Sequence, residues 1–305
     1  TRCSRDWSSD VCSSDLGIKA STMTKTRFLA LERKSAEQIV ADRTLNNVYV
    51  TRKTLEFCGQ HKWNYRISSG MMPLETLPEA NLLLENTYNF SKIKQEFDLC
   101  AGVIKKYNIR CSTHPDQFVV PASSNPNVVK KSIEELEMHG KMMDYFELPQ
   151  SYDAPINIHM NCYKGDIKDI AMRFIDVYKT LSPSVRNRLV LENEDKPNSW
   201  KVEELYDYVH QNTGIPITYD NLHYRCNTGK LSAKEAVKLS KSTWGKYRPL
   251  FHFSDNDTNN RNPRAHADYV RDLPEEYVGE NEVDYEFEFK AKDYAIERFE
   301  KDFKI

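Results

Sequence analysis

The chain has 305 residues, of which 29% are charged and 39% hydrophobic, and its formal net charge at pH 7 is −2. That length suits one large barrel or two small domains. No apolar stretch is long enough to cross a bilayer and no secretory hydrophobic region precedes the body, so we expect a soluble, cytoplasmic protein with no membrane partner. The charge gives no support for a nucleic-acid binder but does not exclude one, because clustered carboxylates lower the total while a basic face survives.

The first 20 residues do not share the periodicity of the rest of the chain. Asp6 to Leu16 reads Asp-Trp-Ser-Ser-Asp-Val-Cys-Ser-Ser-Asp-Leu, which matches, residue for residue, the translation of a widely used sequencing-adapter DNA. We therefore exclude residues 1–16 from the fold prediction and interpret residues 1–20 as a non-native, adapter-derived segment with a short stub. Residues 21–305 are predicted to form a single domain.

Strand and helix patterns alternate after this segment. A long helix at 34–59 comes first, followed by a strand at 63–69 and helical material between 78 and 107. Asn125 and Pro126 mark a helix start, and Ser232 with Glu235 has the spacing of a capping box. Later strands are predicted at 109–115, 156–161, 189–194, 217–222, 250–255 and 283–289, and later helices at 127–146, 167–181, 197–210, 231–241, 263–270 (short) and 290–303.

This alternation predicts parallel strands joined by right-handed crossovers. Eight units of about 35 residues need about 280 residues, which fits an α/β fold of the TIM-type (β/α)8 barrel class. Seven strands are recognisable, and the remaining one should precede the helix that begins near Lys34. We therefore expect the first strand to be missing or replaced by the non-native segment, with residues 17–21 as its remnant. A missing strand would leave two unpaired edges and an unstable barrel.

Six of the predicted strands end near a residue that can bind a metal ion. Because the carboxyl ends of barrel strands meet at one face, such side chains are predicted to share a site. His223 and His266 lie close to two of these strand ends. Three carboxylates and five imidazoles predict a cluster of two or three divalent ions, with manganese favoured over zinc by the oxygen ligands. The six residues, spaced by 45, 33, 28, 32 and 36 positions, are His114, His159, Glu192, Asp220, His252 and Glu288.

Other polar residues are predicted to have structural or peripheral roles. His61, His139 and His210 lie near or on helices and are interpreted as surface residues. The segment 194–196 is interpreted as a solvated loop, and Cys162 as a packing residue. The basic residues that could contact phosphates are Arg110, Lys164, Lys196, Arg225, Arg261 and Arg264.

From about Arg27 to Lys292 the chain resembles the UV damage endonuclease family. The resemblance rests on an ordered set of short motifs rather than on any single one. It implies a TIM-type barrel that bends DNA, flips out a damaged dinucleotide and cuts the strand on its 5′ side with up to three metal ions. The motifs are His-Pro-x-Gln at 114–117, Ile-His at 158–159, Leu-Glu-Asn-Glu-Asp at 191–195, Asp-x-x-His at 220–223, His252 with Ser254, Ala-His-Ala at 265–267 and Glu-x-Lys-x-Lys at 288–292.

Carried over residue by residue, the resemblance implies three metal sites that share ligands. Gln117 and Phe118 stand where the family has a Gln-Tyr pair that fills the gap left by the flipped bases, and Phe118 keeps the ring that this wedge needs. The implied catalytic residues are Glu192, Asp220, His252 and Glu288. The implied sites are His114, His159 and Glu192; Glu192, as a bridge, with Asp220, His252 and Glu288; and His223 with His266.

Three departures from the family pattern bear on this site. Leu77 stands where the family usually has another histidine, which leaves the first metal one imidazole short unless Glu75 reaches in. Leu250 stands where some members carry a modified lysine, two residues before His252. The family's first strand, with an aromatic probe and a DNA-contacting loop, is not recognisable in this sequence.

The prediction that follows is a monomeric, metal-dependent DNA repair endonuclease that nicks double-stranded DNA 5′ to UV photoproducts, acting at the nucleoid. Two alternatives remain open. One is an abasic-site endonuclease of the same barrel type, although Gln117 and Phe118 favour a dinucleotide lesion. The other is a sugar isomerase-type metal-dependent barrel, which needs fewer histidines than this chain carries at its predicted strand ends.

Overall fold

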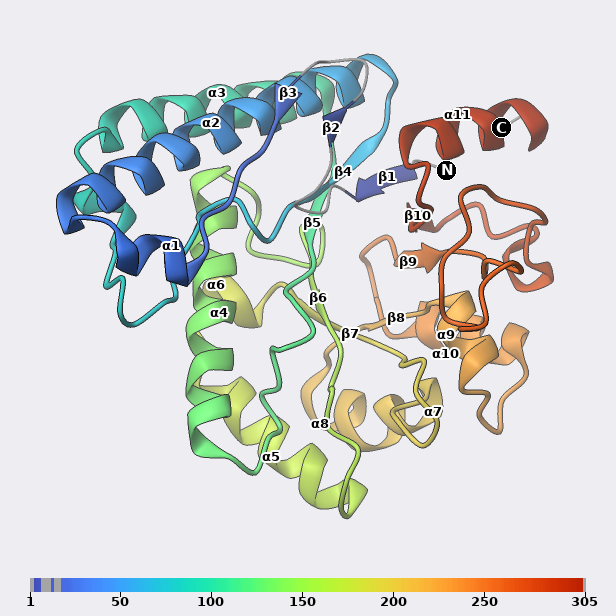
Figure 1. Ribbon diagram of the computed structural model, residues 1–305. Helices are drawn as coiled ribbons and strands as arrows, with labels where there is room; N and C mark the ends of the chain where they lie inside the picture. Colours follow the sequence, from blue (N-terminus) through green and yellow to red (C-terminus); the bar gives the residue numbers. More distant parts are fainter. Residues whose placement is uncertain (1–2, 7–11, 14–17, 304–305) are drawn as a thin grey trace.

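In the computed structural model, which describes residues 3–6, 12–13 and 18–303, eight parallel strands form one sheet. The strands are β1 (Cys3–Asp6), β4 (Asn64–Ile67), β5 (Cys111–Thr113), β6 (Ile156–Ile158), β7 (Leu189–Glu192), β8 (Ile217–Thr218), β9 (Leu250–Phe253) and β10 (Asp284–Phe287). Their order, β8-β7-β6-β5-β4-β1-β10-β9, places strands that follow one another in sequence side by side (Figure 1). A parallel bridge between Asp220 and His252 joins the two ends of the sheet. The predicted TIM-type (β/α)8 class is confirmed.

The backbone of Cys3–Asp6 takes the place of the first barrel strand. Ser4 pairs with Glu286 of β10 on one side and with Asn64 of β4 on the other, so both edges that a missing strand would leave are paired. Main-chain hydrogen bonds do not depend on the side chain, so a segment of unrelated composition can fill this position. Of the expected strand remnant, Ile18–Lys19 (β3) is not part of the barrel sheet, because it pairs antiparallel with Cys12–Ser13 (β2) in a separate sheet. Residues 1–2, 7–11 and 14–17, which include most of the adapter-like segment, lie outside the described residues.

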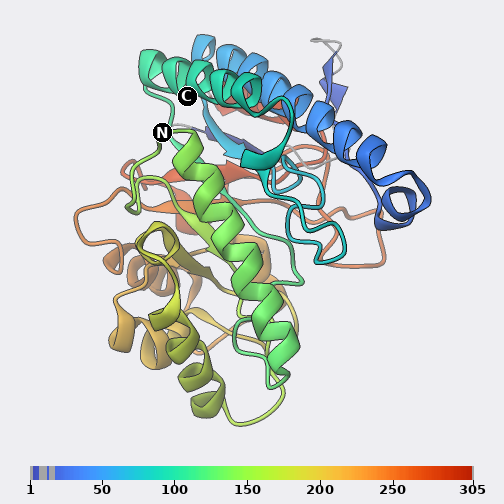
Figure 2. The same cartoon turned by 90° about the vertical axis from the view of Figure 1, so that its left-hand side faces the viewer.

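Helices surround the barrel, and two long ones, α2 and α3, run side by side along one flank (Figures 1 and 2). None of the helices among the described residues is both long and apolar enough to cross a membrane. The α-helices are α1 (Lys25–Ala30), α2 (Arg33–Gln60), α3 (Phe90–Tyr107), α4 (Pro126–Tyr145), α5 (Ile167–Thr180), α6 (Pro183–Arg186), α7 (Val202–Leu205), α8 (Gln211–Thr213), α9 (Asn221–Cys226), α10 (Ala233–Ser242) and α11 (Asp293–Phe303). Short 3-10 turns are η1 (Leu84–Asn86) and η3 (Glu275–Tyr277), and η2 (Tyr206–His210) is a π-helical turn.

The predicted helix starts are confirmed where capping residues marked them. The Asn125 side chain accepts a hydrogen bond from the backbone N–H of Asn127, 3.0 Å away, and Pro126 is the first residue of α4. Ser232 caps α10, and the Glu235 carboxylate accepts a reciprocal bond of 2.8 Å from the Ser232 backbone N–H. These side chains satisfy backbone donors that a helix leaves free at its first turn.

Two helix predictions differ from the structure. The pattern at 197–210 predicted one helix, but regular helix begins only at Val202 and passes into the π-helical turn at Tyr206. The segment 263–270 contains no helix. It folds back instead, with the Ala267 N–H donating to the Asp255 carbonyl over 2.7 Å. Local sequence patterns cannot predict this pairing, because it joins backbone groups that are distant in sequence. Here it replaces the hydrogen bonds of a helix.

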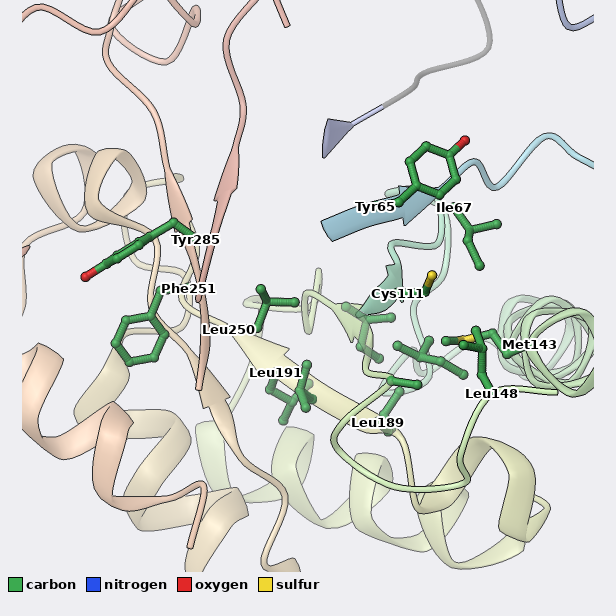
Figure 3. Close-up of a cluster of buried hydrophobic side chains, with 14 of the residues drawn as sticks. Tyr65, Ile67, Cys111, Met143, Leu148, Leu189, Leu191, Leu250, Phe251 and Tyr285 are labelled. Carbon is green, nitrogen blue, oxygen red and sulfur yellow. The ribbon is translucent and has the colours of Figure 1, made fainter. Parts of the chain in front are cut away.

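Apolar residues of β7 and β9 belong to one large buried hydrophobic cluster. Figure 3 shows Leu189, Leu191 and Leu250 among side chains that form one buried hydrophobic cluster. Leu250, which stands two residues before His252, is buried in this cluster. The Leu250 side chain therefore adds to the hydrophobic core, and because it is apolar it cannot act as a metal ligand.

An ion-pair clamp stabilises the amino end of the barrel. Asp284, at the start of β10, accepts a bond of 2.9 Å from Arg110 Nη1 and one of 2.7 Å from Arg248 Nε. The remaining Arg110 donors bind backbone carbonyls, including that of Asp153 at 3.0 Å. The suggestion that Arg110 contacts phosphate at the mouth is therefore wrong, because this residue precedes β5 and its side chain is engaged at the opposite end.

Candidate metal centre

Glu192, the last residue of β7, lies at the centre of a group of imidazoles and is fully buried. Its Oε2 atom lies 3.3 Å from His114 Nε2, 3.7 Å from His159 Nε2 and 3.2 Å from His252 Nδ1. These histidines lie at the carboxyl ends of β5, β6 and β9, so the parallel topology brings together residues separated by as much as half the chain. The structure thus gathers three of the predicted ligands around a fourth, the Glu192 carboxylate.

Asp220 and His223 approach the same carboxylate from the end of β8. Asp220 Oδ1 caps α9 by accepting a bond of 2.6 Å from the His223 N–H. The same turn of helix brings His223 Nδ1 to 2.9 Å from Glu192 Oε1. Asp220 Oδ2 is buried and accepts no hydrogen bond from the described residues. A buried carboxylate oxygen without a donor is costly, and a bound cation would satisfy it.

Glu288 completes the group from the strand end of β10. Its Oε1 atom lies 3.3 Å from His252 Nδ1 and 2.6 Å from Arg66 Nη1. Its Oε2 atom lies 3.9 Å from Nε2 of His266, which is at the edge of the site. Glu288 therefore connects the buried carboxylates to the more exposed rim of the mouth.

Three overlapping groups have ligand atoms that all lie within 4.8 Å of one another, as a shared metal ion requires. In the described part of the chain, none of these groups contains His223 or His266, so a third metal on that pair stays a prediction. The groups are His114, His159 and Glu192; Glu192, Asp220 and His252; and His252, Glu286 and Glu288. The first group has the same residues as the first ligand set expected from the sequence, and the second group contains the expected second set without Glu288.

The charges of the site also fit a cation. Burial opposes ionisation of Glu192, but neighbouring imidazoles, with the His252 charge first among them, outweigh it and hold the pKa of this carboxyl well below its usual range. Burial lowers the pKa of His159 to about 3, so its imidazole is neutral at pH 7 and keeps a lone pair for a metal. Burial raises the pKa of Asp220. Carboxylates gathered this deeply need compensating positive charge, which divalent ions provide.

A cavity of about 380 Å³ opens above these residues. Gln117 lines it, and Phe118 projects from the same loop with 76% of its surface exposed. An exposed aromatic ring beside an acidic cavity is a suitable stacking surface for a base. The other side chains named for the site that line this cavity are His114, His159, Glu192, His223, His266 and Glu288.

Below the strand-end ligands lies a second polar layer that the sequence analysis missed. Its members stand two residues before a predicted ligand on the same strand, and side chains two apart on a strand face the same side. Ser112 precedes His114, Asn157 precedes His159, and Glu286 precedes Glu288 in this way. The two-residue period was therefore the available signal. Arg66, whose guanidinium lies among the site carboxylates, carried no such signal.

Two residues expected at the surface are buried. His139 lies behind β5 with Nδ1 3.0 Å from Thr113 Oγ1, and burial lowers its pKa to about 3. Glu194 Oε1 accepts a bond of 2.9 Å from the Asn161 N–H, and burial raises its pKa to about 7. Both predictions were wrong because burial depends on elements that pack from elsewhere in the chain. His61 is exposed, as predicted, and His210 is partly buried.

A model of the family described as UV-endonuclease UvdE matches residues 9–304. The chain belongs to the UV-endonuclease UvdE family. A curated relative named UV DNA damage endonuclease, from Nostoc sp. strain PCC 7120, is 30% identical over 292 residues, which is 92% of this chain and 85% of the relative. The resemblance seen in the sequence motifs is confirmed, and the chain is an enzyme of this endonuclease family.

Solved structures agree with this membership. The crystal structure of SacUVDE matches with a TM-score of 0.82 at 27% identity and covers 99% of both chains. Endonuclease IV from Thermus thermophilus has a TM-score of 0.56 at 12% identity, covering 83% of this chain and 94% of that one. This second likeness concerns the fold alone, and it supports the barrel architecture.

Leu77, where the sequence resemblance implied a histidine ligand, does not line the cavity of the candidate metal centre. Leu77 packs against a small apolar cluster that includes Phe28 and Val40, away from the metal cavity. Glu75 does not take its place, because Glu75 Oε1 lies 3.3 Å from Lys141 Nζ and the side chain does not line the cavity. Within the described residues, the group of His114, His159 and Glu192 therefore gains no ligand from this segment.

Proposed function

We propose that this protein is a metal-dependent DNA repair endonuclease that nicks the phosphodiester 5′ to UV photoproducts, pyrimidine dimers above all. The observation that supports this most directly is the buried Glu192 carboxylate, with three imidazole nitrogens within 3.7 Å of one oxygen. A carboxylate exposed to water would not need neighbouring imidazoles to compensate its charge. Membership of the UvdE family supports UV-damaged DNA as the substrate. Because DNA is the proposed substrate, we expect the protein to act in the cytoplasm, at the nucleoid.

In this proposal some of the side chains would bind cations, and others would contact DNA. Glu192 would bridge two ions, with His114 and His159 on one side and the other carboxylates and His252 on the other. When bound, divalent ions supply the positive charge that activates a water for attack on phosphorus and that stabilises the departing 3′ oxygen. The catalytic residues in this proposal are Glu192, Asp220, His252 and Glu288.

Oxygen-rich ligation favours manganese over zinc for these two ions. His223 and His266 are the proposed ligands of a third ion, at the more exposed side of the cavity. Gln117 and Phe118 would fill the space left by the flipped dinucleotide, and the exposed Phe118 ring supports this role. We expect the protein to act as a monomer, since one chain supplies all the proposed ligands, and light scattering of the purified protein would test this.

The test is nicking of supercoiled plasmid by the purified protein with manganese. UV-irradiated plasmid should be nicked, unirradiated plasmid should not, and EDTA should abolish the activity. Sequencing-gel mapping of an end-labelled duplex with one pyrimidine dimer should place the cut on the 5′ side. Equal nicking of irradiated and unirradiated plasmid would refute lesion specificity. Preference for a duplex with one abasic site would instead identify an abasic-site endonuclease.

We also propose that residues 1–20 are non-native and that residues 21–305 form the enzyme domain. The pairing of Cys3–Asp6 with β4 and β10 is compatible with this, because backbone pairing does not select the sequence. Replacing residues 1–16 with the first-strand segment of the Nostoc relative should raise the free energy of unfolding by about 1–3 kcal/mol, through better-fitting inward side chains. A loss of stability in urea denaturation would contradict the proposal.

A further inference from the structure

Glu286 belongs to the polar layer beneath the site and contacts one of its proposed ligands directly. It lies on β10 beside His252 on β9, and the two residues are register partners in the sheet. Both side chains are almost completely buried. A buried carboxylate is stable only when its lone pairs find donors, so its partners indicate its role.

Protein donors surround Glu286. Its Oε2 atom lies 3.1 Å from His252 Nε2 and 2.7 Å from Arg66 Nη1. Its Oε1 atom accepts a hydrogen bond from the Ser112 hydroxyl. The Arg66 charge compensates that of Glu286, so the carboxylate stays ionised and acts purely as an acceptor. Because Glu286 does not line the cavity, it has no direct contact with the space a substrate would fill.

The other nitrogen of His252 faces the proposed metal ligands. His252 Nδ1 lies 3.2 Å from Glu192 Oε2, 3.3 Å from Glu288 Oε1 and 4.0 Å from Asp220 Oδ2. An imidazole can bind a metal through one nitrogen only when the proton resides on the other. Asn157 Nδ2 also lies 3.3 Å from His252 Nε2, but an amide nitrogen is a donor and cannot accept the Nε2 proton, so the acceptor is Glu286.

We propose that Glu286 is a positioning residue, which holds a proton on His252 Nε2 so that Nδ1 is free for a divalent ion. The inference rests on the proposed function in so far as His252 is a metal ligand. Ser112 and Arg66 in turn fix the orientation of Glu286, so these three side chains together set the tautomer of His252. Without this acceptor, the ring can take its proton on Nδ1 and lose the metal-binding lone pair.

The experiment measures manganese affinity by titration of the metal-free protein, with free Mn²⁺ followed by electron paramagnetic resonance. Glu286→Leu, which removes the acceptor, should weaken binding by about 10–100-fold, the range seen for outer partners of histidine ligands. Glu286→Gln should recover part of this loss, since its amide oxygen can still accept the Nε2 proton. Asp284→Asn is the matched control, because it removes a buried, arginine-paired carboxylate from the same strand two residues away.

A second readout reports the tautomer itself. Long-range ¹H–¹⁵N correlation spectra of the zinc-loaded protein, with the His252 signals assigned by mutation, should show the proton on Nε2 in wild type. The proposal is overturned if the zinc-bound ring carries its proton on Nδ1. It is also overturned if the affinity loss in Glu286→Leu is no larger than in Asp284→Asn. Loss of one whole metal equivalent in Glu286→Leu, with the rest bound normally, would make Glu286 a ligand and also refute the proposal. Wild type that binds no divalent metal at all would instead refute the proposed function.

Discussion

The two ends of the barrel use the same side-chain chemistry with opposite charge balance. At the amino end, one carboxylate, Asp284, faces two guanidiniums, those of Arg110 and Arg248. At the carboxyl end, Arg66 is the guanidinium that contacts the site carboxylates, pairing with Glu286 and Glu288. Four buried or nearly buried carboxylates gather there, and neighbouring imidazoles compensate them only when protonated. The four are Glu192, Asp220, Glu286 and Glu288.

This difference separates a structural ion-pair cluster from a binding site. The amino-end clamp is complete without any ligand, because each Asp284 oxygen already accepts from an arginine. The carboxyl-end cluster leaves Asp220 Oδ2 without a donor among the described residues. A buried carboxylate oxygen without a donor, next to an open cavity at one end of a barrel, therefore indicates where cations bind.

The largest expected effect is on the central carboxylate. Glu192→Gln keeps the size of the side chain but removes the charge that three histidines face. Nicking of UV-irradiated plasmid should fall by more than about 100-fold, beyond the range for residues that only position a ligand. Asp284→Asn, at the other end, should retain nicking activity under conditions where it is folded. Comparable nicking by Glu192→Gln and wild type would contradict the proposed role.

The second effect is a loss of folding stability when the ion-pair clamp at the amino end of the barrel is broken. Asp284→Asn leaves two arginines without their carboxylate, and breaking a buried ion pair costs about 3–5 kcal/mol. Since Arg248 is partly exposed, the lower part of this range is expected. Urea denaturation in the presence of EDTA measures the loss. A variant as stable as wild type would show that the clamp has no structural role.

A third, smaller effect is the gain in folding stability when manganese binds at the carboxyl end of the barrel. Manganese at about 100 times its dissociation constant should raise the free energy of unfolding by about 2.7 kcal/mol, because it binds the folded state alone. Asp284→Asn should gain as much as wild type does, relative to its own EDTA-treated state. Glu192→Gln should gain far less. An equal gain in all three proteins would point to binding away from the predicted centre.

The smallest effect concerns His139, a buried base whose described hydrogen-bond partner is the Thr113 hydroxyl. The pKa of His139 is lowered to about 3 by burial, so its neutral form is favoured in the folded state. The unfolded chain binds a proton below about pH 6.5, and the stability contribution, fully present above that pH, is lost as pH falls towards 3. Between pH 7 and pH 5 this linkage costs about 2 kcal/mol.

The matched variant is His139→Leu, in which Thr113 keeps its hydrogen bond to the Ile67 carbonyl. Urea denaturation at pH 5 and pH 7 with EDTA should show a smaller loss of stability on acidification in this variant than in wild type. If the two proteins lose the same free energy between these pH values, His139 is accessible to protons in the folded state.

The sequence by itself determined the barrel class and which polar side chains stand at the ends of its strands. Alternation of strand and helix patterns gave the architecture, and the spacing of His114, His159 and Glu192 placed them at one face, because parallel strands have a common direction. Capping residues such as Ser232 located helix starts, since a cap is satisfied by its own local backbone. All of these signals lie within a few residues or repeat with a fixed period.

Only the tertiary structure decided which charges are compensated and by what. Arg66 and Glu286 are 220 residues apart in sequence, and only barrel closure brings them to 2.7 Å. The burial of His139 and the engagement of Arg110 at the far end likewise depend on packing partners from other parts of the chain. The occupation of the first strand position by Cys3–Asp6 is a property of backbone pairing, which no side-chain pattern records.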